Sequence, residues 1–328
     1  MSPSSFVDQT NSLKPSVLIT GSAGFIGSHL AERLLLEGNR VLGIDNFDPF
    51  YSRQLKAQNL SVLRAHPGFR FVEGDLADAT LYQTLPTDID VVVHLAAKAG
   101  VRPSIEGPLS YVEANIKATN LLLDWMQSHR LKHYVFASSS SVYGNREETP
   151  FRDSDSVDNP ISPYAFTKKS CELMNYTYYH LHDISTVNLR FFTVYGPRQR
   201  PDLAINKFVR LIRAGEPIPM FGDGTTARDY TFVEDTVDGV IRAIDFVMRP
   251  GLTFETINLG NDRPTPLKEL ILTLYELLDE EPNIQQLPMQ PGDVNITCAS
   301  VEKARALLGY APRTGRNPDC RIGLCMLS

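Results

Sequence analysis

Tyr164 and Lys168 stand four residues apart in the segment "YAFTK" and could act together on a proton. The surrounding residues 162–182 have helical character, and residues at i and i+4 share one face of a helix. A free tyrosine has a pKa of about 10 and is a poor base at neutral pH, but a fixed ammonium nearby would favour the phenolate. Such a pair also arises by chance in a chain with 13 tyrosines, so the alternative is a surface tyrosine beside a surface lysine.

A run of serines, residues 138–141 in "ASSSSVYG", precedes this pair at the end of an expected strand. The end of that strand would point into the same crevice as the tyrosine and the lysine. A serine hydroxyl there could orient a substrate hydroxyl between itself and the phenolate. The alternative is that these serines satisfy backbone groups at a strand end.

Gly21, Gly24 and Gly27 follow the apolar run "SVLIT" and open a helix, the context in which a glycine motif binds a dinucleotide. They would allow a tight turn, the close approach of a pyrophosphate and close packing of helix on strand, in that order. Asp45 ends the next strand, where its carboxylate can accept hydrogen bonds from an adenosine ribose and repel a 2′-phosphate. This favours NAD over NADP. Asp75 ends a third strand and could contact the adenine.

The order of elements indicates what positions these residues. Short apolar segments alternate with helix-length segments through roughly the first 190 residues. The expected strands are "SVLIT", "RVLGID", "FRFVEGD", "DVVVHLAA", "HYVFASSS" and "STVNLRFF". Strand and helix repeated in this way predict an α/β fold, a Rossmann-type doubly wound parallel sheet that binds ligands at the carboxyl ends of its strands. Beyond Pro197 the chain is richer in proline and glycine, which predicts a smaller α/β lobe interleaved with the first.

Composition narrows the function classes. The 328 residues are 42% hydrophobic and 21% charged, which is typical of a globular protein. With a net charge of -6 and no basic stripe, no nucleic-acid partner is expected, and the apolar runs are too short to span a membrane. Residues 1–15 lack the apolar core of a signal peptide. Because Cys171, Cys298, Cys320 and Cys325 have no zinc-type spacing, a reduced cytoplasmic protein without a metal is expected.

Taken together, these segments resemble the extended short-chain dehydrogenase/reductase family, and within it the NAD-dependent nucleotide-sugar epimerases and dehydratases. The glycine motif, Asp45, "HLAAKAGV", "SSSSVYG", the Tyr164 and Lys168 pair, "YGP" and "RDYTFVED" occur in the order of that family over about residues 16–314. The resemblance implies an NAD cofactor, a UDP-sugar substrate and a homodimer, with helices near 109–129 and 162–182 pairing across a twofold axis. The apolar faces of those helices could equally pack on the sheet.

The resemblance also assigns site residues. Ser139, Tyr164 and Lys168 match the catalytic set, and Asn115 matches a supporting helix residue. Cofactor contacts are expected at Gly21, Gly24, Phe25, Ile26, Gly27, Asp45, Asn46, Asp75, Leu76, Leu95, Ala96, Ala97, Lys98, Tyr164 and Lys168. Substrate contacts are expected at Arg102, Ser139, Ser140, Ser141, Tyr164, Thr193, Arg200, Phe221 (uracil stacking), Arg228 (UDP phosphate) and Asp293 (uridine ribose).

Several segments resemble one branch, the UDP-glucuronate 4-epimerases: "DNFDPFYSRQLK", "AGVRPSIEGPLSYVEANI" and "LRFFTVYGPRQRPD". Thr193 stands where many UDP-hexose epimerases, decarboxylases and dehydratases carry Asn, and Arg200 stands where uronate epimerases place a positive charge for the sugar carboxylate. The 4-ketone formed during epimerisation is β to that carboxylate, so the enzyme must hold the carboxylate against loss of carbon dioxide. The alternative for Arg200 is a solvated loop arginine.

Other functions remain open at this level. A UDP-glucose or UDP-N-acetylglucosamine 4-epimerase is the strongest rival, and a UDP-glucuronate decarboxylase is a further one. Decarboxylases and dehydratases usually carry an acidic residue where this chain has Ser141. A catalytically idle NAD-binding regulator would not need the Tyr164 and Lys168 pair.

The expected domain limits follow the same pattern. Residues 1–15 would be a disordered tail and 16–192 the NAD-binding domain, to which some later segments return. Residues 193–314 would form most of the nucleotide-sugar-binding lobe, and 315–328 an atypical C-terminal tail, because Gly315, Asn317 and Pro318 break a helix there.

Overall fold

The computed structural model describes residues 14–289 and 294–314. At its centre lies a 7-stranded parallel sheet with the order β10-β6-β5-β4-β1-β2-β3, which confirms the predicted fold class. Its strands are β1 (Ser16–Thr20), β2 (Arg40–Asp45), β3 (Phe69–Glu73), β4 (Val91–His94), β5 (His133–Ser139), β6 (Ser185–Phe191) and β10 (Phe254–Leu259). The strand order reverses between β1 and β4, the place where such sheets open a ligand crevice.

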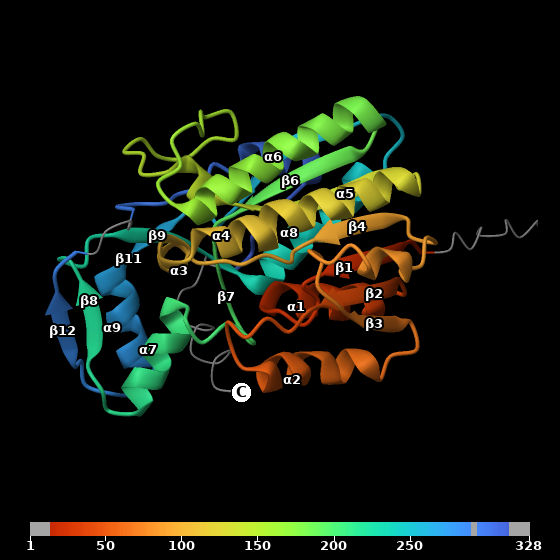
Figure 1. Cartoon of the computed structure of the whole chain (residues 1–328). Helices are drawn as coiled ribbons and strands as arrows, with labels where there is room; N and C mark the ends of the chain where they lie inside the picture. The colour runs from red at the N-terminus through yellow and green to blue at the C-terminus, as the bar shows by residue number, and fades with distance from the viewer. Residues whose placement is uncertain (1–13, 290–293, 315–328) are drawn as a thin grey trace, which may run out of the picture.

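Helices cover both faces of this sheet (Figure 1). One face carries α1 (Phe25–Leu36), α2 (Arg53–Arg64) and α8 (Val233–Val247). The other carries α5 (Ala118–Ser128) and α6 (Pro163–His182). Shorter helical segments are η1 (Leu81–Gln83), α3 (Val101–Glu106), α4 (Pro108–Tyr111), η2 (Val112–Lys117), η3 (Ser140–Tyr143) and α10 (Glu302–Leu308).

The single helix expected over 109–129 is wrong in one respect, because α4 and α5 are joined by η2, a π-helical segment. Wider turns of this kind are rare and are frequently found at functional sites. Here η2 contains Asn115, which is buried and turned toward the loop after β4. The distortion therefore coincides with the residue that contacts this loop.

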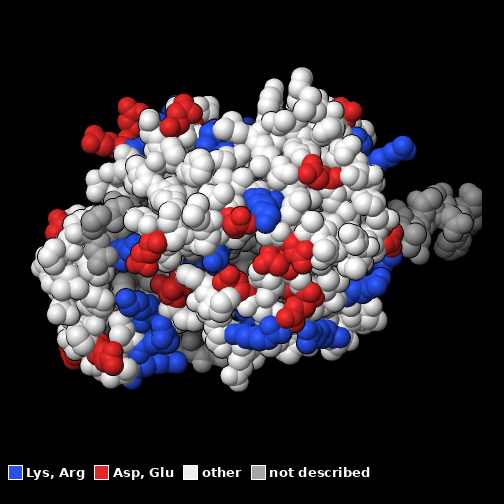
Figure 2. Space-filling model, in the orientation of Figure 1, with Lys and Arg blue, Asp and Glu red and all other residues white. Residues whose placement is uncertain are grey.

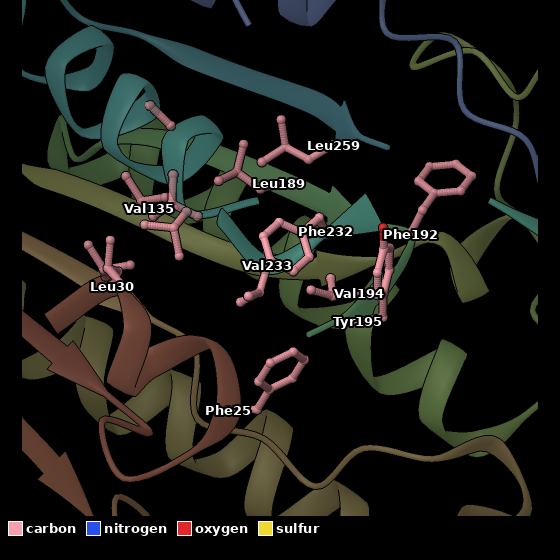
Figure 3. Close-up of a cluster of buried hydrophobic side chains, with 14 of the residues drawn as sticks. Phe25, Leu30, Val135, Leu189, Phe192, Val194, Tyr195, Phe232, Val233 and Leu259 are labelled. Carbon is pink, nitrogen blue, oxygen red and sulfur yellow. The ribbon is translucent and has the colours of Figure 1, made fainter. Parts of the chain in front are cut away.

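The core has two layers because successive strand residues point to opposite faces. In β1, Val17 and Ile19 join the layer beneath α1 and α8, whereas Leu18 joins the layer beneath α5. Figure 3 shows Val135 and Leu189 in the first of these layers, where they pack with side chains of α8. Burial on both faces explains why the strands are nearly continuous apolar runs.

A smaller lobe lies beside the main sheet, at the left of Figure 1. It contains a 3-stranded sheet of β11 (Pro264–Pro266), β9 (Ala227–Phe232) and β7 (Thr193–Tyr195), and a 2-stranded sheet of β12 (Ile284–Leu287) and β8 (Ile218–Phe221). Its helices are α7 (Ala204–Arg213) and α9 (Leu267–Leu277). Between these segments the chain returns to the main sheet through α8 and β10.

Two further observations concern the distribution of charge on the surface and the length of the apolar helices. On the face shown in Figure 2, basic and acidic side chains are interspersed. Across the described ranges, no helix is both long and apolar enough to cross a membrane.

Candidate active site

A cavity of about 510 Å³ opens at the carboxyl ends of the central strands. The structure brings most of the predicted site residues together in its lining: Gly21, Gly24, Phe25, Ile26, Gly27, Asp45, Asn46, Asp75, Leu76, Leu95, Ala96, Ala97, Lys98, Ser139, Ser140, Ser141, Tyr164, Lys168, Thr193 and Arg200. The cavity runs from the β2 end, beside Asp45, to the loop that follows β7, beside Arg200.

The glycine turn between β1 and α1 leaves its backbone bare toward this cavity. Gly21 has φ of +74, and a Cβ atom there would lie 2.9 Å from the Ala96 nitrogen. A Cβ atom on Gly27 would overlap the Gly21 carbonyl. Among the residues that the structure describes, no side chain caps the amino terminus of α1 at Gly24, so its N–H groups and dipole suit an anion in the cavity. The turn therefore fits the pyrophosphate of a dinucleotide.

Asp45 lies at the end of β2 with its carboxylate held in place. One carboxylate oxygen accepts a hydrogen bond from Phe47 N at 2.8 Å and the other from Ala23 N at 3.2 Å. The Lys56 ammonium is 3.8 Å from the first of these oxygens. Burial raises the pKa of Asp45, and the charge of Lys56 opposes that shift. A carboxylate oxygen can accept more than one hydrogen bond, so this group can still bind a ribose diol.

Sequence reasoning missed Lys56 and Tyr51, which also line the cavity. The Lys56 ammonium lies 4.8 Å from the centre of the Tyr51 ring and donates to the Asp48 carbonyl at 3.0 Å. A signal for Lys56 existed, because it shares the buried face of α2 with Leu60 and Leu63 at helical spacing. A lysine on such a face needs an anionic or aromatic partner. The buried Tyr51 hydroxyl has no hydrogen-bond partner within the described residues.

Asn115 holds the loop that follows β4. Its side-chain oxygen accepts from Lys98 N at 2.8 Å, and its amide donates to the Lys98 carbonyl at 3.0 Å and to the Thr167 hydroxyl at 2.9 Å. The Lys98 ammonium reaches Asp48 at 3.8 Å across the cavity. Asn115 thus ties this loop to α6.

Tyr164, Lys168 and Ser139 meet where α6 crosses the end of β5. Tyr164 and Ser139 are joined by a hydrogen bond, and the Ser139 hydroxyl also donates to Ser141 Oγ at 3.1 Å. The Lys168 ammonium donates to the Ala137 carbonyl at 2.7 Å. Burial lowers the pKa of Lys168 to about 8.

The acidity of Tyr164 differs from the sequence expectation. Burial raises its pKa above the ordinary value, while the hydrogen bond with Ser139 and the charge of Arg200 act in the opposite direction. The chain by itself thus keeps Tyr164 a phenol, because the cost of burying an anion outweighs these two interactions.

The far end of the cavity holds Thr193, at the start of β7, and Arg200. Arg200 Nε and one of its terminal nitrogens donate to the Asp202 carboxylate at 3.0 and 2.8 Å. Its guanidinium also lies 5.2 Å from the centre of the Phe50 ring. Arg200, for which the alternative was a solvated loop arginine, therefore contacts both the Asp202 carboxylate and the Phe50 ring.

Three predicted substrate contacts, Arg102, Phe221 and Arg228, are not part of the lining of this cavity. The Arg102 guanidinium lies 5.2 Å from the centre of the Phe221 ring, so these two residues meet outside the lining of the cavity. Arg228 stands on β9 and donates to the Ala227 carbonyl at 2.9 Å. Asp293 lies outside the described residues.

Comparison with known proteins places these features among nucleotide-sugar enzymes. A family model described as the NAD dependent epimerase/dehydratase family matches residues 17–260. The UDP-glucuronate 4-epimerase of Thermodesulfobacterium geofontis is 41% identical over 300 residues, which cover 90% of this chain and 90% of that protein. UDP-glucuronate 4-epimerase 3 of Arabidopsis thaliana is 42% identical over 326 residues, with 94% of this chain and 74% of that protein covered.

A solved structure shows the same likeness in three dimensions. The UDP-glucuronic acid 4-epimerase of Bacillus cereus, in complex with UDP-glucuronic acid and NAD, superposes with a TM-score of 0.85 at 34% identity. The match covers 95% of this chain and 96% of that one.

Proposed function

The chain belongs to the NAD-dependent epimerase/dehydratase family, and on that basis we propose that it interconverts UDP-glucuronate and UDP-galacturonate through a transient 4-keto sugar. The observation that carries this proposal is the meeting of Tyr164, Lys168 and Ser139 in the cavity that Arg200 and Thr193 close at its other end. The first three suit reversible oxidation of a sugar hydroxyl, and the last two suit a sugar with a carboxylate.

The residues present suit a resident NAD. The turn 21–27 and the amino terminus of α1 would hold the pyrophosphate, and the Asp45 carboxylate would hold the adenosine ribose, with Lys56 beside it. When bound, NAD would accept hydride from carbon 4 of the sugar and return it to the opposite face of the ring. A cofactor restored in every cycle has no need to leave.

The chain's own residues handle the proton. Tyr164 takes up the proton of the 4-hydroxyl and returns it when the ketone is reduced. Ser139, already hydrogen-bonded to Tyr164, orients that hydroxyl. Lys168 lies on the same face of α6 as Tyr164, and the Ala137 carbonyl holds its ammonium in place. Its positive charge favours the phenolate form that Tyr164 must adopt.

The sugar carboxylate needs a separate hold. Because the 4-ketone is β to it, free rotation would align the breaking bond with the carbonyl and release carbon dioxide. Ser140, Ser141 and Thr193 offer hydroxyl groups, and Arg200 offers a charged fork that suits a carboxylate. Phe221, Arg228, Arg102 and Asp293 are proposed to bind the UDP moiety.

The experiment that tests this function is product identification by NMR across a panel of UDP-sugars, with no NAD added. UDP-glucuronate should give UDP-galacturonate. UDP-xylose as the main product would instead indicate a decarboxylase, and conversion of UDP-glucose without the uronate would indicate a neutral-sugar epimerase.

We also propose that the protein works as a homodimer in the cytoplasm. Leu109 of α4 is 78% exposed, and Phe166 and Leu173 of α6 are 48% and 58% exposed. These apolar side chains lie on the neighbouring helices α4 and α6, so a second copy could bury them across a twofold axis. The thiols of Cys171 and Cys298 are free, which suits a reducing compartment.

A further inference from the structure

Three consecutive residues at the end of β5 contact three residues of α6 that are spaced four apart. Ala137 accepts a hydrogen bond from Lys168, and Ser139 shares one with Tyr164. Between them, the Ser138 hydroxyl donates to Glu172 Oε1 at 2.6 Å. Residues 164, 168 and 172 lie on one face of the helix, so each strand residue meets its own helix residue. The proposed mechanism uses the outer two contacts and leaves Glu172 without a role.

Glu172 is a buried anion with a full set of partners. Arg190 of β6 donates to both of its carboxylate oxygens at 2.9 Å, and both side chains are 5% exposed. Arg190 also donates to the Tyr143 hydroxyl at 2.9 Å, and the Lys169 ammonium lies 4.0 Å from Glu172. A buried ion pair of this kind is expensive to desolvate and adds little to stability compared with apolar residues, so its presence calls for another benefit.

The surroundings of Lys168 indicate that benefit. The groups that face it are Phe136 and the Ala137 carbonyl of β5, His94 of β4, and Cys171 and Glu172 of α6. Burial lowers the pKa of His94 to about 3 and raises the pKa of the Cys171 thiol, so both groups are neutral at neutral pH. Glu172 is then the group facing Lys168 that carries a negative charge.

We propose that Glu172 is a positioning residue of this active site: it holds the carboxyl end of β5 against α6 and keeps Lys168 a cation. The inference rests on the proposed function, because a cationic Lys168 matters only if Tyr164 must become a phenolate. Arg190 donates to both carboxylate oxygens of Glu172 and so orients this carboxylate toward Ser138.

The test compares kcat as a function of pH for the holoenzyme and its Glu172→Gln variant, with whichever UDP-sugar the wild type converts. At neutral pH the two rates should agree within about threefold. Above it, the alkaline decline of the variant should begin about one pH unit earlier, which makes its rate about tenfold lower there. Glu255→Gln, on β10, removes the half-buried partner of Lys303 on α10 and should leave the profile unchanged.

A double variant, Glu172→Met with Arg190→Met, separates charge from architecture. Apolar side chains of similar volume should keep the unfolding temperature near that of the wild type, and the early alkaline decline should persist. If Glu172→Gln does not fold, this double variant carries the test. A wild-type pH profile in the double variant, or a loss in Glu172→Gln by the same factor at every pH, would overturn the proposal. Absence of wild-type turnover of UDP-glucuronate would overturn the proposed function instead.

Discussion

A Cβ atom on Gly27 would overlap the carbonyl oxygen of Gly21, so the first turn of α1 closes on the end of β1 without room for a single methyl group. The same overlap fixes how near the amino terminus of α1 lies to the cavity. Because the turn must open to accept a side chain, it links stability to cofactor binding.

Gly27→Ala should therefore lower both properties. We expect a loss of about 1–3 kcal/mol in the free energy of unfolding, as for other overpacked sites, and loss of copurified NAD. Gly24→Ala is the matched control for the unfolding measurement, because its Cβ atom would lie 3.0 Å from the same carbonyl and needs only a small shift. Thermal unfolding and the absorbance of NAD released on denaturation would measure the two effects. A wild-type unfolding temperature in Gly27→Ala would contradict the packing argument.

Tyr164→Phe should abolish turnover without emptying the site. Removing the hydroxyl removes the group that takes the proton from the sugar, with a loss of about 10²–10⁴-fold in kcat or more. The ring stays packed near Tyr111, so the variant should still copurify with NAD and bind UDP-glucuronate. Substantial activity would remove Tyr164 from the role of base.

Arg200→Gln should weaken binding of the acidic sugar only. Loss of a charged hydrogen bond costs about 1.5–3 kcal/mol, so UDP-glucuronate should bind roughly 10–100-fold more weakly by calorimetry, whereas UDP-glucose should bind as before. Asp202→Asn keeps the guanidinium and serves as the control. An equal loss for both sugars would mean that Arg200 does not recognise the carboxylate.

Acid should destabilise the fold through His94. Its ring is buried between the hydroxyls of Thr20 at 2.6 Å and Thr119 at 3.0 Å, and burial lowers its pKa to about 3. In the unfolded chain His94 binds a proton near pH 6.5, whereas in the folded chain it stays neutral until about pH 3. The contribution of His94 to the free energy of unfolding is therefore complete above pH 6.5 and is lost as the pH falls toward 3. The slope is about 1.4 kcal/mol per pH unit. Denaturant unfolding between pH 7 and pH 5 should show a shallower loss in His94→Gln, and an unchanged slope would contradict the assignment.

Phe166→Glu should separate the two copies of the proposed dimer. The substitution puts a charge in the apolar patch of α4 and α6 without touching the lining of the cavity. Sedimentation should report a monomer for the variant and a dimer for the wild type. Leu36→Glu, at an exposed position of α1, is the control for charge alone. A monomeric wild type would remove the dimer proposal.

Local sequence patterns determined the elements and the reactive residues of this protein. The limits predicted for the second strand coincide with β2, because its apolar residues are bounded by the turn at Gly38 and by Asp45. The spacing of Tyr164 and Lys168 is enough to put them on one face of a helix, and both lie on α6. The serine run ends a parallel strand, and such strands end at the edge of the sheet where ligands bind. This position predicts that the serines share one crevice with Tyr164 and Lys168.

Tertiary structure alone decided which groups these residues meet. The pairing of Glu172 with Arg190, of Lys56 with Asp45 and of Arg102 with Phe221 joins segments that have no common period in the sequence. The π-helical turn at Asn115 likewise contacts a loop from elsewhere in the chain, the one that follows β4. Periodicity and turn chemistry act between near neighbours in the chain, whereas charge, burial and hydrogen bonding act between whatever groups the fold brings within a few ångströms. The sequence therefore determines which reactive side chains are available. The protonation states that allow them to react depend on the groups that surround them in the folded protein.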